Sequence, residues 1–290
     1  MTSGRIAAVL VNWNSSADVV RTVNAIKSEY EDVAAIVVDN HSADSDWSIV
    51  EESLSGEAIL SRLPSNLGYG AGVNHGFRIA LEQDFDWVWL MNPDALPYPD
   101  CLHQLLARSE GCAVLGPRQL SSDSPLSDDA EQYASAVRLN GTRASHETCS
   151  GCASGQHDVA VVTGTGLLVR VPFAHEGGLM NELFFHYKEE FEFVERMTQY
   201  GAVRYVCGAR LWHQRGASLS QSSPRAHYYR VRNELLYLSL RLGTNWRRKA
   251  RTWRWVARSV LGAARSTAQV RAATLRGLSD GLRNRWGKAD

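Results

Sequence analysis

Short apolar segments alternate with helix-like segments through the first 116 residues of the chain. The apolar segments lie at residues 5–11, 33–38 and 87–91. Residues 17–28 and 77–81 lie between them and space their apolar positions as one face of a helix does. Short buried strands separated by helices are typical of βαβ units, whose strands pair in parallel. The alternation therefore predicts an α/β domain with a mainly parallel central sheet flanked by helices.

Polar residues follow each of these apolar segments. They are Asn-Trp-Asn at 12–14, Asp-Asn-His at 39–41 and Asn-Pro-Asp at 92–94. In open parallel sheets, ligands bind in the crevice beyond the carboxyl ends of the strands. The three clusters therefore predict a ligand site along one edge of the sheet.

The second half of the chain begins with a break in the pattern. Residues 117–157 are rich in Ser, Asp and Gly, which predicts a long irregular excursion over the surface. Regular elements then resume, with strands expected at 158–164, 166–171 and 203–208 and helices at 189–200 and 226–242.

The charge of the 290-residue chain is zero in total but unevenly distributed. Residues 241–290 carry 13 Lys+Arg and 2 Asp+Glu, a net charge of +11. The remaining 18 basic and 29 acidic residues give residues 1–240 a net charge of −11. A basic segment on an acidic body indicates contact with an anionic partner.

Residues 244–290, called the tail below, have apolar and small residues at helical spacing, interrupted by Gly262, Gly277 and Gly281. Tryptophan and arginine on an amphipathic helix suit the surface of an anionic membrane, and we expect that partner rather than nucleic acid. The alternative is a helix packed on the parent domain with its arginines in water.

Three further features of the sequence indicate where in the cell the protein is located. No stretch approaches 18 uninterrupted apolar residues, so no spanning helix is expected. The first residues lack the basic region and cleavage site of a signal peptide. Five scattered cysteines predict a reduced cytoplasmic protein, and Cys149 and Cys152 form a single CxxC pair, which is too few ligands for a structural zinc site. We expect a cytoplasmic protein that lies at the inner face of the membrane.

Asp94, Asp39 and His213 are candidate binding residues at strand ends. A carboxylate after a buried strand can hold a divalent cation while substrate phosphates supply other ligands, although Asn-Pro-Asp also forms ordinary turns. Asp39 can accept hydrogen bonds from a nucleoside or can serve a helix cap or Asx-turn. His213 is a candidate metal ligand, or a structural histidine.

Residues 66–76, with the sequence NLGYGAGVNHG, contain four glycines just before a helical stretch. Glycine allows close approach of the backbone to a ligand, and a helix N-terminus favours phosphate. The spacing differs from the dinucleotide fingerprint and lacks the Gly-Lys-Ser/Thr ending of a P-loop.

Residues 182–196 place Glu189, Glu190 and Glu192 behind a cluster of aromatic residues. Carboxylates crowded beside aromatic groups can have raised pKa values and act as general bases. The alternative is a solvated acidic helix start, stabilised by the helix dipole.

The order of these motifs closely resembles family 2 glycosyltransferases of the GT-A fold, and best the rhamnosyltransferase-like branch that builds bacterial surface polysaccharides. The matching segments are VNWN, VDNHSAD, NLGYGAGVNHG, MNPDA, GTGLLVR, EGGLMNELFFHYKEEFEF and the HQRGAS–YYRVRN stretch. The resemblance covers roughly residues 5–240. It implies a GT-A domain at 1–243, with a nucleotide-binding half at about 1–116 and an acceptor and catalytic half at about 158–243, followed by the tail.

The resemblance also assigns roles to residues at matching positions. Those implied to bind a UDP- or dTDP-sugar donor are Asn12, Asp39, Asn66, Gly68, Gly70 and Asn92. Those implied to lie on the acceptor side are Gly164, Thr165, Phe184, Phe185 and Tyr187.

The catalytic residues follow from the same resemblance. Asp94, with His213, would hold Mg²⁺ or Mn²⁺ on the donor diphosphate, and Glu190 stands where the Glu-Asp motif of the family carries its general base. Two departures matter. Asn92 replaces the first acid of the usual Asp-x-Asp, and Glu-Glu replaces Glu-Asp, so Glu189 stays open as the base.

These residues imply an inverting, metal-dependent transfer of rhamnose or another hexose to a hydroxyl of a glycan or polyprenyl-linked acceptor. A sugar nucleotidyltransferase is a first alternative, although its N-terminal glycine-rich signature is absent. A non-catalytic relative that binds nucleotide-sugar or membrane is a second, and the presence of Asp94, Glu190 and His213 argues against it.

Overall fold

A computed structural model describes most of the chain. The described residues are 4–127, 130–132, 136–140, 143–147, 155–162, 164–214, 223–243, 245 and 250–289.

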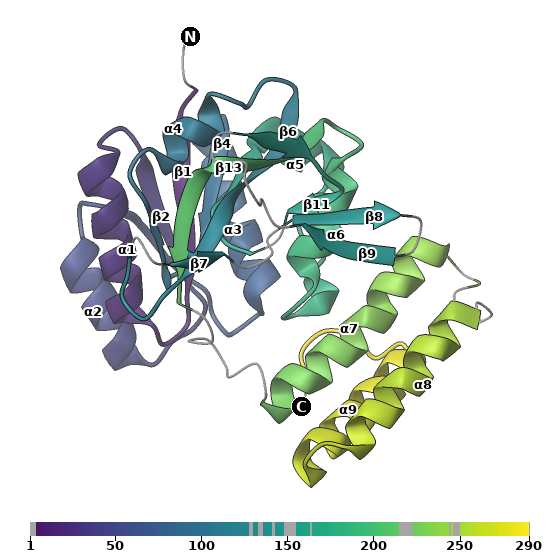
Figure 1. Cartoon of the computed structure of the whole chain (residues 1–290). Helices are drawn as coiled ribbons and strands as arrows, with labels where there is room; N and C mark the ends of the chain where they lie inside the picture. Colours follow the sequence, from purple (N-terminus) through teal and green to yellow (C-terminus); the bar gives the residue numbers. More distant parts are fainter. Residues whose placement is uncertain are drawn as a thin grey trace.

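In this described part, ten strands form the central sheet, with the main order β10-β13-β6-β12-β4-β1-β2-β3 (Figure 1). The strands are β1 (Ile6–Asn12), β2 (Ala34–Asp39), β3 (Ile59–Arg62), β4 (Trp87–Met91), β5 (Ala95–Pro97), β6 (Cys112–Ser121), β7 (Glu131–Gln132), β10 (Gln156–Asp158), β12 (Leu167–Arg170) and β13 (Ala202–His213). The pairs β1–β2, β1–β4, β2–β3 and β6–β13 are parallel, whereas β12 runs antiparallel to both β4 and β6. The predicted α/β class with a mainly parallel sheet is confirmed.

Helices cover both faces of this sheet. On one face lie α1 (Ser16–Glu29), α2 (Asp44–Leu54) and α4 (Cys101–Leu106), and on the other lie α3 (Tyr69–Glu82), α5 (Val171–Gly177) and α6 (Glu189–Met197). Strand β1 is continuously apolar because both of its faces are covered. Val9 packs on the α3 side, while Ala8 and Leu10 pack on the α1 side.

Residues 69–76 of the glycine-rich segment form the first turns of α3, and residues 66–68 precede the helix. A Cβ atom at Gly72 would lie 2.7 Å from Val11, and one at Gly76 would lie 2.4 Å from Val9. These two glycines therefore bring α3 close to β1, which corrects the expectation that they let the backbone approach a ligand.

The prediction of an irregular excursion at 117–157 is wrong, because the described residues of this segment form regular strands. Strand β6 continues to Ser121, and β7 pairs with it. A separate three-stranded sheet is built of β8 (Ala136–Asn140), β9 (Arg143–Glu147) and β11 (Val161–Val162). The strand expected at 158–164 is instead divided between β10 and β11, which belong to different sheets.

The described part of the tail contains two helices. They are α8 (Ala250–Ala264) and α9 (Ala268–Leu282), which lie near α7 (Pro224–Leu242) in Figure 1. A Cβ atom at Gly277 would lie 2.6 Å from the carbonyl oxygen of Tyr228, and one at Gly281 would lie 2.7 Å from Leu235. Both glycines thus permit close packing of α9 on α7, as the packed-tail alternative predicted for this part.

The cysteines differ from the expectation of a fully reduced chain. Cys101 and Cys112 are buried thiols, whereas Cys207 is disulfide-bonded. The CxxC pair at 149 and 152 lies outside the described residues. Within the described parts, no helix combines the length and apolar character needed to cross a bilayer.

Candidate active site

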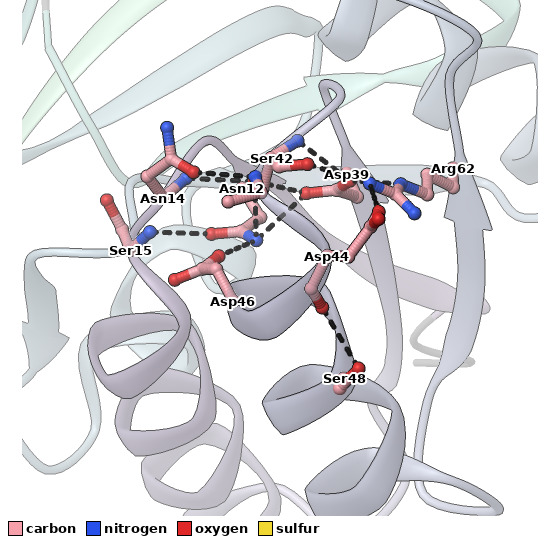
Figure 2. Close-up of polar contacts among 10 residues, drawn as sticks. Asn12, Asn14, Ser15, Asp39, Ser42, Asp44, Asp46, Ser48 and Arg62 are labelled. Carbon is pink, nitrogen blue, oxygen red and sulfur yellow. Dashed lines mark hydrogen bonds and ion pairs between the residues drawn. The ribbon is translucent and has the colours of Figure 1, made fainter.

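The carboxyl ends of β1 and β2 meet in a closed polar corner (Figure 2). The side-chain amide nitrogen of Asn12 lies 3.0 Å from Asp39 Oδ1 and 2.9 Å from Asp46 Oδ1. Arg62 Nε and the backbone N–H of Ser42 each donate to Asp39 Oδ2 at 3.1 Å. The side chain of Asp39 is completely buried and both of its oxygens are partnered.

These contacts make the corner a framework. Although burial opposes ionisation, hydrogen bonds from Asn12 and Ser16 lower the pKa of Asp46. Asp39 accepts the Ser42 N–H within its own turn, in line with the turn alternative. Its contact with a nucleoside, and that of Asn12, stay predictions. Sequence reasoning missed Arg62, which lies on a strand that was not predicted.

Asn66 and Gly68 join this corner to the second half of the site. The side-chain amide of Asn40 donates to the carbonyl oxygen of Gly68 at 3.1 Å, and Gly68 N donates to Asn66 Oδ1 at 3.0 Å. Gly68 has φ +96°, and a Cβ atom there would lie 2.3 Å from the carbonyl oxygen of Phe185. Glycine is therefore required at position 68 by the close passage of another loop.

Asp94 and His213 are brought together from the loop after β4 and the end of β13. His213 Nε2 lies 3.2 Å from Asp94 Oδ1, and the backbone N–H of Gln214 donates to the Asp94 carbonyl at 3.0 Å. Asp94 Oδ2 is buried and accepts no hydrogen bond. A buried carboxylate oxygen without a donor, beside an imidazole, fits a divalent cation. The described residues hold no cluster of three or more His, Cys, Asp or Glu that could bind a metal unaided, so phosphate oxygens would have to complete the set.

Asn92 is held in place beside this pair. Its backbone N–H donates to the hydroxyl of Thr165 at 2.6 Å, and its side-chain oxygen accepts from the Tyr69 hydroxyl at 3.2 Å. Burial, followed by the carboxylates of Glu190 and Glu189, raises the pKa of Tyr69, so this phenol stays protonated. Sequence reasoning missed Tyr69 because nothing in a glycine-rich helix start marks one side chain as pointing into a site.

Glu189 and Glu190 begin α6 and face different neighbours. Glu189 is buried, lies against Gly70, and has one carboxylate oxygen without a hydrogen-bond partner. Burial and the neighbouring Glu190 raise the pKa of Glu189 to about 8. Burial also raises the pKa of Glu190, while a hydrogen bond from the Gly164 backbone and the nearby His213 act to lower it. Glu190 thus interacts with His213 and with the Gly164 backbone, whereas Glu189 lies against Gly70.

The 183–187 loop, which leads into α6, is fixed by hydrogen bonds to its carbonyl groups. The buried side chains of Arg232 and Asn233 on α7 supply many of the donors. Five consecutive carbonyl groups accept hydrogen bonds: Leu183 from Arg232 and Gly287, Phe184 from Arg232 and Asn233, Phe185 from the backbone of Tyr69, and His186 and Tyr187 from Asn233. Phe185, Tyr187 and Lys188 have φ of +62°, +70° and +80°, values that non-glycine residues rarely adopt. These donors therefore hold a backbone that would not persist alone.

The end of the tail contributes to the same loop. Gly287 N donates to the Leu183 carbonyl at 2.8 Å, and Arg232 donates to the Gly287 carbonyl. Ala289 N donates to the Tyr229 hydroxyl at 2.9 Å, and Lys288 Nζ lies 3.4 Å from the carbonyl oxygen of Asn66. The tail is thus connected to both halves of the site, which the sequence did not indicate.

The expected aromatic acceptor wall is largely enclosed. Phe184 is fully buried against Leu236 and Tyr237, so its assignment to the acceptor wall is wrong. Phe185 stacks on Tyr229 with ring centroids 5.3 Å apart and is also buried. Tyr187 is half-buried and remains a candidate contact for the acceptor.

The sequence of the chain matches a known family. The family model described as Glycosyl transferase family 2 matches residues 7–159, more than half of the chain. The chain therefore belongs to glycosyl transferase family 2, a family of glycosyltransferases, as the order of its motifs predicted.

Solved structures share the fold of the chain. GalNAc-T7 with UDP, GalNAc and Mn²⁺ matches with a TM-score of 0.62 and 14% identity over 81% of this chain, which spans 50% of that protein. S. aureus TarS 1-349 in complex with UDP-GlcNAc matches with a TM-score of 0.63 and 13% identity, over 96% of this chain and 81% of that one. At these identities the likeness shows the GT-A fold alone. A search of curated proteins found no match.

Proposed function

We propose that the protein is an inverting glycosyltransferase that moves a sugar from a nucleotide-diphospho-sugar to an acceptor hydroxyl. The observation that carries this proposal is the buried, hydrogen-bond-free Oδ2 of Asp94 beside His213, a histidine whose charge also acts on Glu190. A cation site and a carboxylate that can accept a proton are the two groups that such a transfer requires.

Asp94 and His213 would hold Mg²⁺ or Mn²⁺, which when bound supplies positive charge against the charge that grows on the leaving diphosphate. Asn92 stands in place of an acid, so its side chain contributes a hydrogen bond instead of a metal bond. Its oxygen is occupied by the Tyr69 hydroxyl, which leaves its NH₂ group to donate to donor oxygens.

Glu190 would act as the general base. As the acceptor oxygen attacks the anomeric carbon, its proton passes to the Glu190 carboxylate, and the bond from that carbon to the diphosphate oxygen breaks. Glu189 would stay protonated through this step, because two neighbouring buried carboxylates do not both ionise readily. Inversion follows from this single displacement.

The remaining contacts are proposed by position. The nucleotide of the donor would be UDP or dTDP. Its nucleoside and diphosphate would be contacted by Asn12, Asp39, Asn66, Gly68 and Gly70. Support comes from TarS, whose structure with UDP-GlcNAc covers 96% of this chain, and from GalNAc-T7, whose structure contains UDP and Mn²⁺.

On the acceptor side we propose Gly164, Thr165, Phe185 and Tyr187. Rhamnose or another hexose would pass to a glycan or to a polyprenyl-linked sugar in the synthesis of cell-surface polysaccharide. The +11 charge of residues 241–290 suits a cytoplasmic protein that lies at the anionic inner face of a membrane, where such acceptors are held.

A thermal-shift screen of UDP-, dTDP- and GDP-sugars, with and without Mn²⁺, tests the donor and metal assignments together. One donor should raise the melting temperature by mass action, and more so with Mn²⁺. That donor should then be hydrolysed slowly, or transferred to an added acceptor, only with metal present. Binding without turnover for any acceptor would instead indicate a non-catalytic relative, and no binding would reject the proposal.

A further inference from the structure

Helix α8 has an inner face that packs on the rest of the tail. The inward positions recur at helical spacing, and Trp255 and Val256 contact the cluster formed by Leu235 and Leu278. Ala263 is buried on the same side. These contacts, with the buried Thr252, anchor the inner face of the helix.

The opposite side of α8 exposes large apolar residues. Trp253 is 49% exposed, Val260 41% and Leu261 64%. At 100° per residue these three fall within about 100° of the helix circumference. They form one continuous apolar stripe.

Arginines lie directly beside this stripe. Arg254 and Arg258 project within about 40° of one another on the same helical wheel, next to Leu261, and Arg265 follows in the turn that ends α8. All three are exposed, and none forms an ion pair with another described residue. Residues 235–279 contain ten Lys+Arg and no Asp or Glu, so no acid in this stretch neutralises them. We call the apolar stripe and these arginines the α8 outer face.

The chemistry of the outer face selects among anionic partners. A second copy of the face would bring like charges together, which is unfavourable. Nucleic acid would be bound through phosphate contacts, which make no use of Val260 and Leu261. A membrane with anionic headgroups satisfies both parts at once, because apolar side chains enter the acyl boundary while arginines contact phosphate.

We propose that the α8 outer face lies in the plane of an anionic lipid surface, with Trp253, Val260 and Leu261 inserted and Arg254, Arg258 and Arg265 among the headgroups. Figure 1 shows α8 and α9 beside α7, on the side of the molecule opposite α1 and α2. With α8 on the lipid, α1 and α2 would therefore face away from it. The proposal gives the membrane contact proposed above a defined surface and does not depend on the transfer reaction.

Co-sedimentation of the full chain with vesicles tests it, using phosphatidylcholine alone or mixed with phosphatidylglycerol. The wild type should bind the mixed vesicles and not the neutral ones, and added salt should weaken binding. Replacing all three arginines by glutamine should weaken partitioning about a hundredfold, since each contributes about fivefold near an anionic surface. Leu261→Ser should weaken it about tenfold through lost apolar burial.

Leu240→Ser is the matched control, because Leu240 is 47% exposed but lies on α7. It should bind vesicles as the wild type does. Equal binding by all variants, or equal loss in Leu240→Ser and Leu261→Ser, would overturn the proposal. So would a dimer that the arginine variant dissociates, or tighter binding to a DNA oligonucleotide than to mixed vesicles.

The melting temperature of each variant identifies any that fails to fold. If Leu261→Ser fails, Leu261→Gln replaces it, because glutamine is polar and has a higher helix propensity than serine. The nucleotide-sugar thermal shift is measured on the same samples. Vesicle binding without a nucleotide shift would contradict the proposed function alone, whereas the reverse would contradict only the lipid surface.

Discussion

Asp39 and Glu189 are both buried carboxylates at the proposed site. They differ in how many of their carboxylate oxygens accept hydrogen bonds. Asp39 accepts from Asn12, Ser42 and Arg62, so its charge is compensated inside the fold. Glu189 has an oxygen without a partner and a raised pKa, and Asp94 nearby also keeps one oxygen unpartnered. Complete hydrogen bonding makes a framework, whereas unmet polar atoms leave room for a ligand or a proton.

This contrast predicts that changes at the two places have different consequences. Changes in the Asp39 corner should reduce the free energy of unfolding. Changes at Asp94 and the glutamate pair should reduce activity while the fold survives.

The largest effect is expected for Asp94→Ala. Transfer should fall by about a thousandfold or more, because the metal would lose its main protein ligand. Calorimetry should show that Mn²⁺ no longer strengthens nucleotide binding, while the melting temperature is kept. Unchanged Mn²⁺-dependent binding would remove Asp94 from the metal site.

Glu190→Gln should bind the donor normally yet lose roughly 10²–10⁴-fold in kcat, because an amide cannot accept the acceptor proton. Glu189→Gln is the control, since adjacent helical residues point about 100° apart. Steady-state kinetics that rank Glu189→Gln as the more damaged variant would assign the base to Glu189.

Asp39→Ala should lower the free energy of unfolding by about 2–3 kcal/mol, because the buried donors of Asn12 and Ser42 lose their acceptor. Urea unfolding measures this directly. Full stability with lost nucleotide binding would show that Asp39 serves the ligand and not the framework.

Arg232→Lys should reduce kcat by about ten- to a hundredfold through a displaced 183–187 loop, with donor affinity unchanged. Lysine cannot reach the three carbonyl groups that the guanidinium contacts. Arg241→Lys, on the same helix but paired with Glu195, is the control and should keep wild-type kinetics. A loss of stability with unchanged kcat would show that Arg232 only packs.

A pH dependence of stability should also arise from Glu189. Its folded pKa of about 8 lies above the ordinary value of 4.5, so the folded state holds the proton more tightly. Stability should therefore fall as pH rises from about 4.5 to about 8, and this fall should be weaker in Glu189→Gln. Melting curves across this range test it, and parallel curves for the two proteins would contradict it.

The sequence predicted the parts of the fold that are buried on both faces. Strands β1 and β4 have continuous apolar runs because helices cover both sides of the sheet there, and such runs mark strand ends clearly. The short strands β7 to β10 have no such runs, so their segment looked like a loop. Gly277 and Gly281 resemble helix breakers in sequence, and only the closeness of α7 explains them.

The candidate site was predictable where one residue type carries the chemistry. Asp94 and His213 were named from their types and positions, and the fold brings these two together. The assignment of the base to Glu190 came from the family resemblance and stays a prediction. Tyr69 and Arg232 lie in segments that match the family, but they were given no role. Their contacts with Asn92 and with the 183–187 loop depend on the fold and not on the local sequence.

The contacts of Gly287 and Ala289 with the site also bear on the order of events during protein synthesis. Strands β1 to β4 leave the ribosome early and can fold as they emerge. The 183–187 loop receives the backbone donor of Gly287 only after that residue has been translated. A nascent chain would therefore fold these strands before the 183–187 loop receives the donor of Gly287, so completion of this loop would wait for the tail to emerge.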